Sequence, residues 1–223
     1  MLQQIDKKKV FLYIIFLLIL TSINNINFKN IGHLKINKFI ISGLENENNQ
    51  NLLQNLKKLK LDNIFFLKQT KIKNIIESNN LVETYFVNKE YPSTLNIKIK
   101  KTNLLANTNI NSNFYYIGSN GKLIKTDYIN ENLPYLYGNP KIDQFIKFKK
   151  IIDLSKFEYN EISDIYFYPS NRWDIKIKNE ILIKLPQNKI SNILDLCFDV
   201  MKSKEFSNIE IIDARIKNQL IIK

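Results

Sequence analysis

Apolar residues change their spacing from one region of the chain to the next, and the first region is a continuous run. Val10 to Leu20 is uninterrupted apolar and aromatic sequence, and the first charge after it is Lys29. The run is short of the roughly 20 residues that comfortably span a bilayer, so its length leaves a cleaved signal peptide open. Because no pair of small residues suited to cleavage follows, the sequence favours an uncleaved signal anchor over residues 10–27.

The charges on either side of this run predict its orientation. Lys7, Lys8 and Lys9 directly precede it. By the positive-inside rule these lysines hold the N-terminus in the cytoplasm. We therefore expect a cytoplasmic tail over residues 1–9 and a location outside the cytoplasm for everything after Phe28.

A strand-like pattern and two helical patterns follow, and then two more strand patterns. Ile36 to Leu44 is strand-like, and leucines at helical spacing come next. Gln69 to Ser78 has a second helical pattern, with its isoleucines on one face. Val82 to Lys89 and the stretch around Leu95 to Ile99 alternate as strands do, with a turn between them. This order predicts one compact α+β domain within residues 28–103, which include a juxtamembrane segment.

From Leu104 onward the pattern is rich in strands and predicts a second, mainly antiparallel β domain with flanking helices over residues 104–223. Asn120 and Gly121 stand between two strand-like stretches and suit a tight hairpin, because both residue types tolerate a positive φ angle. Trp173 to Ile177 and Ile181 to Leu185 form a second hairpin with one apolar face. Since Trp173 begins an alternating strand, we expect its indole in the core, with a place on a binding surface as the alternative.

A helix and two terminal strands complete the second domain. The helix carries Cys197, the only cysteine, among apolar residues at helical spacing. Neither an intrachain disulfide nor a cysteine-based zinc site is therefore possible, and the spacing predicts a buried thiol. The last strands are predicted at Ile209 to Ile216 and at Leu220 to Lys223, with a turn around Asn218.

The net charge of +12 and the pI near 9.5 leave a basic nucleic-acid-binding protein as one alternative. The distribution of charge favours a diffuse solvated surface, because lysines are scattered along the whole chain and the only arginines are Arg172 and Arg215.

The sequence contains no recognisable catalytic motif. His33 is the single histidine, and the five glycines form no nucleotide-binding fingerprint. We therefore expect no enzymatic activity, cofactor, metal ion or small-molecule substrate.

Several segments in this order resemble the FtsQ/DivIB family of bacterial division proteins. The turn region Tyr91-Pro92-Ser93 between two strands is similar to the family's POTRA domain. Leu133-Pro134-Tyr135-Leu136-Tyr137-Gly138 resembles its Leu-Pro-x-Leu-x-Gly segment, and Ile212-Asp213-Ala214-Arg215 resembles its Asp-x-Arg strand. Trp173 also opens a strand, as in the family. The resemblance covers essentially the whole chain, although Glu180 stands where the Trp hairpin usually has glycine.

The resemblance implies a non-enzymatic scaffold of the divisome, anchored once in the inner membrane with its folded domains in the periplasm at the division septum. It implies binding of FtsB and FtsL and a role in controlling septal peptidoglycan synthesis. The POTRA domain is implied to dock further division proteins. The alternative within the same fold is another POTRA-containing assembly or transport component, although the chain shows no further POTRA repeat or barrel.

The resemblance also places the principal partner site at the C-terminal edge, and the chemistry of the residues agrees. The predicted set is Arg215, Ile216, Leu220, Ile221, Ile222 and Lys223. An arginine fork can pair a partner carboxylate, and an apolar terminal strand can be completed by another chain. In the alternative, Arg215 pairs with Asp213 or Glu210 and the tail packs on its own domain.

Overall fold

The computed structural model describes residues 7–23, 35–59, 64–67, 69–203 and 208–223. These residues divide into two compact units. The first holds the described residues up to Ser78 together with Tyr85–Ile99, and the second holds Asn79–Thr84 together with the described residues from Lys100 onward. Each unit has its own sheet and its own buried residues.

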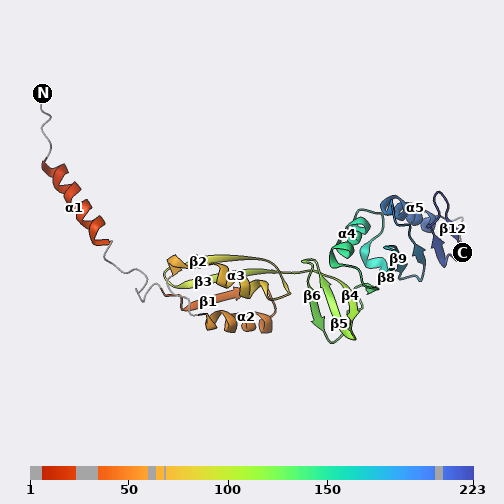
Figure 1. The fold of residues 1–223 in the computed structure, drawn as a ribbon, viewed down its shortest axis with the longest axis horizontal. Coiled ribbons are helices and arrows are strands. Elements are labelled where there is room, and N and C mark those ends of the chain that lie inside the picture. The colour runs from red at the N-terminus through yellow and green to blue at the C-terminus, as the bar shows by residue number, and fades with distance from the viewer. Residues whose placement is uncertain (1–6, 24–34, 60–63, 68, 204–207) are drawn as a thin grey trace, which may run out of the picture. The chain divides into compact units, whose positions relative to one another are not determined.

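Helix α1 (Lys7–Ile23) forms over the N-terminal apolar run (Figure 1). Its 17 residues give a length of about 26 Å at 1.5 Å per residue. Within the part of the chain that the structure describes, no helix combines the length and apolar character needed to cross a membrane. The anchor predicted over residues 10–27 is thus not confirmed, and residues 24–27 lie outside the described ones.

The first unit has the predicted order of strand, helix, helix, strand and strand. Its elements are β1 (Lys38–Ser42), α2 (Asn46–Lys58), the 3-10 turn η3 (Ile64–Phe66), α3 (Gln69–Glu77), β2 (Val82–Glu90) and β3 (Thr94–Lys101). The three strands are ordered β1-β3-β2, so β3 is central. β1 runs parallel to β3, from Lys38 beside Thr94 to Ser42 beside Lys98.

The core of the first unit follows from the two sequence periods. Leu52 and Leu56 are four residues apart on α2, and both are buried, as are Ile72 and Ile76 on α3. Alternate residues of β3 are buried in the same unit, including Leu95. A helix brings residues four apart to one face, whereas a strand brings alternate residues to one face. The predicted helices and strands are confirmed here, although the first strand is shorter than the stretch Ile36 to Leu44.

The second unit is built on a nine-stranded sheet. Its strands are β4 (Leu104–Ile110), β5 (Asn113–Gly118), β6 (Leu123–Thr126), β7 (Tyr135–Tyr137), β8 (Ile162–Phe167), β9 (Trp173–Ile177), β10 (Leu182–Lys184), β11 (Ile211–Asp213) and β12 (Ile221–Ile222). Their order is β12-β11-β10-β9-β8-β7-β4-β5-β6. Five of the eight described pairings are antiparallel. The other three are parallel, which the sequence patterns did not indicate.

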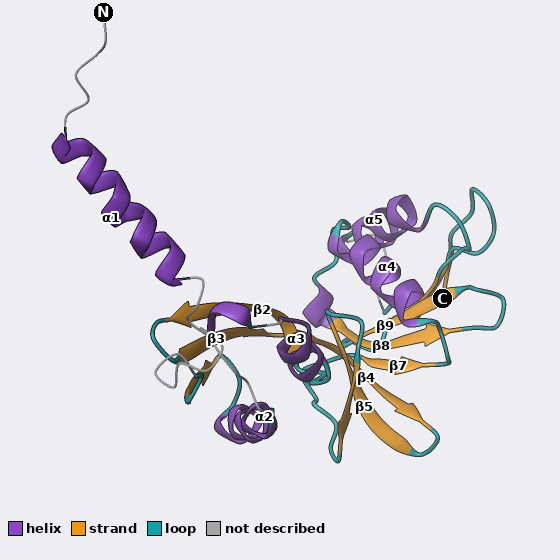
Figure 2. Ribbon diagram, turned by 60° about the vertical axis from the view of Figure 1, so that its left-hand side comes forward, coloured by secondary structure: helices purple, strands orange, loops and turns teal. Residues whose placement is uncertain are grey.

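Two helices cover this sheet and complete its core. α4 (Ile142–Asp153) and α5 (Ile190–Lys202) lie beside each other over the sheet, and the short 3-10 turn η4 (Tyr159–Glu161) precedes β8 (Figure 2). Trp173 is 6% exposed. Its ring stacks on Phe148 of α4 with centroids 4.3 Å apart and tilts against Phe167 at 4.6 Å. The prediction that Trp173 lies in the core is therefore confirmed.

The two predicted hairpins share one turn geometry. In the first, the Gly121 amide donates to the Gly118 carbonyl, and the Gly118 amide donates to the Lys122 carbonyl. In the second, the Glu180 amide donates to the Ile177 carbonyl, and the Ile177 amide donates to the Ile181 carbonyl. Gly121 has φ +74° and Glu180 has φ +74°. The first turn is thus wider than a two-residue Asn-Gly turn, and only the glycine of that pair has a positive φ angle.

Candidate partner-binding site

The C-terminal edge of the nine-stranded sheet is formed by β11 and β12. β11 runs parallel to β10, with Ile212 beside Ile183. β12 returns antiparallel to β11 and ends the sheet, with Ile222 beside Ile212. Ile212 is fully buried and fixes β11 to the core, whereas β12 has only two residues. This arrangement makes β12 an edge strand, as predicted for the terminal segment.

The backbone hydrogen bonds at this edge leave the N–H and C=O groups of one residue facing outward. Ile211 and Lys223 exchange two bonds, since the Lys223 amide donates to Ile211 at 3.0 Å and the Ile211 amide donates back at 3.0 Å. In an antiparallel pair the next residue along each strand turns its N–H and C=O groups to the other side. The N–H and C=O of Ile222 therefore face the free edge of the sheet.

The side chains of the predicted site divide into packed and exposed ones. Leu220 packs against the core of the second unit. Ile216 and Ile221 are 52% and 38% exposed. Lys223 is exposed, and Ile222 is half-buried. The structure thus brings all six predicted residues together at the β11–β12 edge, with two apolar side chains open to a partner.

Arg215 is held by an aspartate of its own strand segment. Its Nε donates to Asp213 Oδ1 at 2.8 Å and Nη2 donates to Asp213 Oδ2 at 2.5 Å. The hydrogen bond from Arg215, together with the nearby charge of Lys184, holds the pKa of Asp213 below its usual value. Arg215 therefore pairs with Asp213, which was the predicted alternative to pairing with a partner carboxylate. Nη1 of Arg215 makes no hydrogen bond to the described residues, and the side chain is 43% exposed.

A groove of about 680 Å³ lies beside this pair, and only Arg215 and Ile216 of its lining residues belong to the predicted site. Its charged lining residues are all cationic, namely Arg172, Lys189, Arg215 and Lys217. Arg172 donates to the buried Asp174 at 3.3 Å and lies 4.3 Å from the centroid of the Tyr168 ring. The groove therefore brings together the chain's only two arginines. The rarity of arginine is the one feature of the sequence that could have drawn attention to Arg172 as a site residue. Its proximity to Arg215 follows only from the fold.

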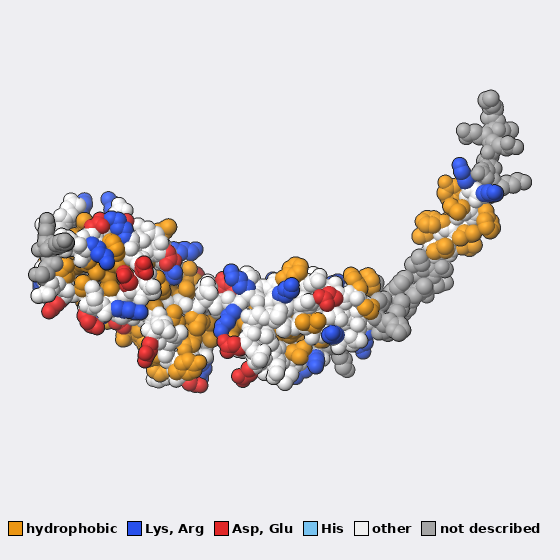
Figure 3. All heavy atoms as spheres, turned by 180° about the vertical axis from the view of Figure 1, so that it is seen from behind, with side chains coloured by type: hydrophobic (Ala, Val, Ile, Leu, Met, Phe, Trp, Pro, Cys, Tyr) orange, Lys and Arg blue, Asp and Glu red, His pale blue; other side chains and the backbone are white. Residues whose placement is uncertain are grey.

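Other candidate chemistry in the chain does not assemble into a reactive site among the described residues. Cys197 is fully buried on α5, and burial raises the pKa of its thiol to about 12. It is thus a core residue, as its helical spacing predicted. Within the described ranges, no cluster of His, Cys, Asp and Glu could hold a metal ion. His33 lies outside those ranges. Lysines and acidic side chains intermingle on the face seen in Figure 3.

Comparisons with known proteins agree with this architecture. The family model described as the POTRA domain, FtsQ-type, matches residues 34–101. The model described as cell division protein FtsQ/DivIB, C-terminal, matches residues 106–215. Together the two matches cover well over half of the chain, and the second one reaches Arg215.

Similar proteins of the same description occur in Rickettsia. The cell division protein FtsQ of Rickettsia bellii is 25% identical over 201 residues, and that of Rickettsia felis is 25% identical over 194 residues. Each alignment covers 85% of this chain and 72% of the relative. A solved structure of the major extracytoplasmic domain of DivIB from Geobacillus stearothermophilus aligns with 14% identity and a TM-score of 0.34, covering 43% of this chain and 87% of that one.

Proposed function

The chain belongs to the FtsQ/DivIB family of bacterial cell division proteins, and from this membership we propose that it is a non-enzymatic scaffold of the divisome. It binds FtsB and FtsL and helps to control septal peptidoglycan synthesis. Residues 1–9 lie in the cytoplasm, residues 10–27 anchor the chain in the inner membrane, and residues 28–103 and 104–223 form two periplasmic domains at the septum. The first of these domains docks other division proteins.

The observation that carries this proposal is the free edge of β12. Ile222 turns its N–H and C=O groups outward there, and such groups can pair with a strand of another chain. The exposed Ile216 and Ile221 side chains add apolar surface at the same edge. We therefore assign FtsB to this edge as an added strand.

The charge of the neighbouring groove favours an acidic partner segment. Arg172, Lys189, Arg215 and Lys217 line it without an acidic lining residue. Asp213 holds the Arg215 guanidinium in place through Nε and Nη2, so that Nη1 remains as the donor to a partner carboxylate. Because the guanidinium is already oriented, less side-chain entropy is lost when the partner binds. Asp213 thus acts as a positioning residue for Arg215.

A pull-down of FtsB tests this assignment with three variants of the full chain. Arg215→Glu reverses the charge at the edge, and a chain ending at Asn218 removes β12. Lys125→Glu is the matched control, because it reverses a charge on β6, at the opposite end of the same sheet. The fluorescence of Trp173, the only tryptophan, reports whether each variant remains folded.

The proposal expects loss of FtsB in the first two variants and retention in the control. Retention of FtsB by all three folded variants would exclude this edge as the binding site. Topology is tested separately with a reporter enzyme fused after Lys223. Reporter activity restricted to the cytoplasm would contradict the membrane orientation, and a fluorescent fusion that fails to concentrate at midcell would contradict the division role.

A further inference from the structure

β1 forms a free edge of the three-stranded sheet in the first unit. In the register with β3, the Lys38 amide donates to the Ser93 carbonyl, so the even-numbered residues of β1 bond to β3. The N–H and C=O groups of Phe39 and Ile41 consequently face away from the sheet. Natural edge strands are usually protected by short length, by charged side chains such as lysine, by proline or by a bulge. The only charged side chain on β1 is Lys38, at its first residue. β1 contains no proline, and its pairing with β3 shows no register shift.

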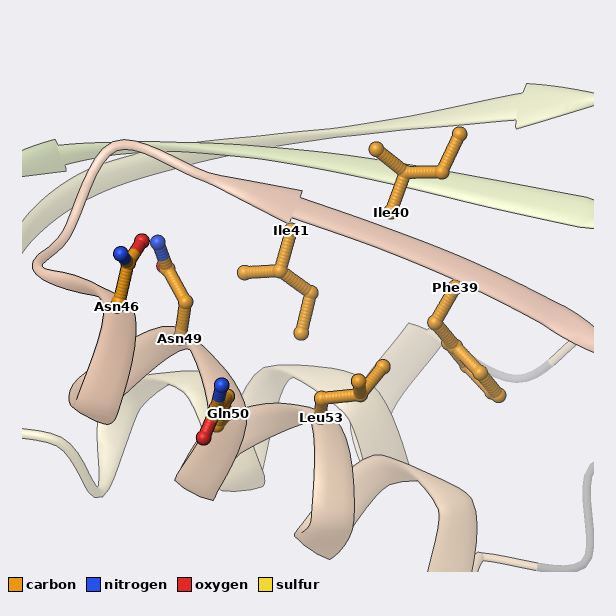
Figure 4. A pocket seen from close by; sticks show the side chains of 7 residues that line it. All are labelled: Phe39, Ile40, Ile41, Asn46, Asn49, Gln50 and Leu53. Atoms are coloured by element: carbon orange, nitrogen blue, oxygen red, sulfur yellow. The ribbon is translucent and has the colours of Figure 1, made fainter.

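A hollow of about 320 Å³ lies beside this edge, between β1 and α2. Figure 4 shows Phe39 and Ile41 directed toward α2, with Leu53 facing them, whereas Ile40 points to the opposite side of the strand. The lining carries no charged side chain. Its shape and chemistry therefore suit an apolar side chain that enters from the edge.

One polar atom of the hollow has an unused hydrogen-bonding capacity. Asn49 on α2 donates through Nδ2 to the Leu44 carbonyl at 2.8 Å. Its buried Oδ1 accepts no hydrogen bond from the described residues. Buried acceptors of this kind are uncommon in folded proteins.

The opposite face of the same edge is cationic. Lys38, Ile40 and Ser42 share this face because side chains alternate along a strand. Lys98 lies beside Ser42 in the register, and both lysines are exposed. Neither forms an ion pair within the described ranges. The two ends of this face therefore attract acidic side chains, with the exposed Ile40 between them.

We propose that the β1 edge binds an extended segment of a partner protein that alternates apolar and acidic residues and adds a fourth strand to the first sheet. Its apolar residues enter the hollow beside α2, and its acidic residues lie near Lys38 and Lys98. A residue between the two acids contacts Ile40. This inference rests on the proposed scaffold role for its choice of a protein partner, but it uses a different site from the β12 edge.

The pattern can be tested with a capped, labelled peptide, Thr-Glu-Val-Ile-Val-Glu-Thr, titrated against the full-length protein in detergent while fluorescence anisotropy is recorded. The peptide pattern is symmetric, so it fits β1 in either strand direction. We expect saturable binding that weakens at high salt, because the lysines are exposed. In an antiparallel pairing the valine amides face β1, whereas in a parallel pairing the isoleucine and glutamate amides do. A version N-methylated on the valines, the isoleucine and the glutamates removes both sets of donors and should not bind.

Charge reversal makes the test specific for this edge. Lys38→Glu should weaken binding of the acidic peptide about tenfold, since it replaces an attraction with a repulsion. A peptide with lysines in place of the glutamates should bind the Lys38→Glu, Lys98→Glu double variant better than it binds the wild type. Lys71→Glu on α3 is the matched control and should leave binding unchanged, because Lys71 does not line the hollow.

Four outcomes would overturn the inference. They are equal binding of the N-methylated peptide, insensitivity to both charge reversals, absence of saturable binding to the folded protein, and a dimer in sedimentation that Lys38→Glu dissociates. The last outcome would assign the edge to a second copy of the chain. Arg215→Glu should not affect peptide binding, because Arg215 belongs to the other unit. If the peptide does not bind at β1 but FtsB still binds at β12, this inference fails and the proposed function stands.

Discussion

β9 and β12 belong to the same nine-stranded sheet, but they are stabilised in different ways. β9 has neighbours on both sides, and Trp173 at its start is enclosed by Phe148 and Phe167. β12 has one neighbour and two residues, and Ile221 on it is 38% exposed. The centre is therefore fixed by packing of apolar rings, whereas the edge is held chiefly by backbone bonds to β11.

This difference separates stability from recognition within one domain. Groups at the centre are satisfied inside the chain, so substitutions there act on folding. Groups at the edge retain unused capacity, namely the Ile222 backbone and Nη1 of Arg215, so substitutions there should act mainly on partner binding. The following predictions test that separation, beginning with the largest effect.

Replacement of Trp173 should have the largest effect on stability. Trp173→Ala removes both ring contacts and leaves a cavity, which should lower the free energy of unfolding of the second unit by about 3 to 5 kcal/mol. Urea denaturation followed by circular dichroism measures it. Leu154→Ala is the control, because Leu154 is 81% exposed and its loss should cost less than about 0.5 kcal/mol. Unchanged stability with lost partner binding would make Trp173 an interface residue instead.

Replacement of Glu180 should stabilise the domain modestly. A residue other than glycine at positive φ costs about 1 to 2 kcal/mol. The exposed Glu180 recovers only part of this through its ion pair with Lys176. Glu180→Gly should therefore raise the free energy of unfolding by about 0.5 to 1 kcal/mol. Asn179→Gly, beside it and without a positive φ, should give no gain. Equal effects of the two variants would contradict the strain argument.

The smallest predicted effect is the pH dependence of the Arg215–Asp213 pair. Since the pKa of Asp213 is lowered in the folded state, the pair stabilises the protein above the usual aspartate pKa, and that stability is lost as the pH falls through the lowered value. Because the pair is partly exposed, solvent screening keeps its contribution small. Arg215→Ala should thus be less stable than wild type at pH 7 but equally stable near pH 2. A difference in stability between the variant and wild type that persists near pH 2 would contradict this role of the pair.

The sequence predicted the regular parts of the fold but not its longer-range pairing. Leucines and isoleucines at helical spacing located α2 and α3, and alternation located β9 and β10. The flanking helices were expected, but α4 was not located, although Phe145, Phe148 and Ile152 have helical spacing. β7 has three residues and pairs in parallel with β4 and β8, so no local pattern could identify its partners.

The candidate site was predictable in its residues and not in its geometry. Family resemblance indicated Arg215 and the terminal strand, and the structure brings them together. The contact between Arg215 and Asp213 could be anticipated from their separation of two residues. The approach of Arg172 to Arg215 in one groove could not, since 43 positions separate them and the sheet order alone makes them neighbours.

The central claim, that β12 pairs with a strand of FtsB, is tested most directly by amide hydrogen exchange at single-residue resolution in the full chain. The Ile222 amide faces the free edge and should exchange quickly in the free protein. With FtsB saturating, its exchange should slow by about tenfold or more, while the amides of β6 at the opposite edge keep their rates. An unchanged Ile222 rate in a complex that does form would contradict strand addition at β12.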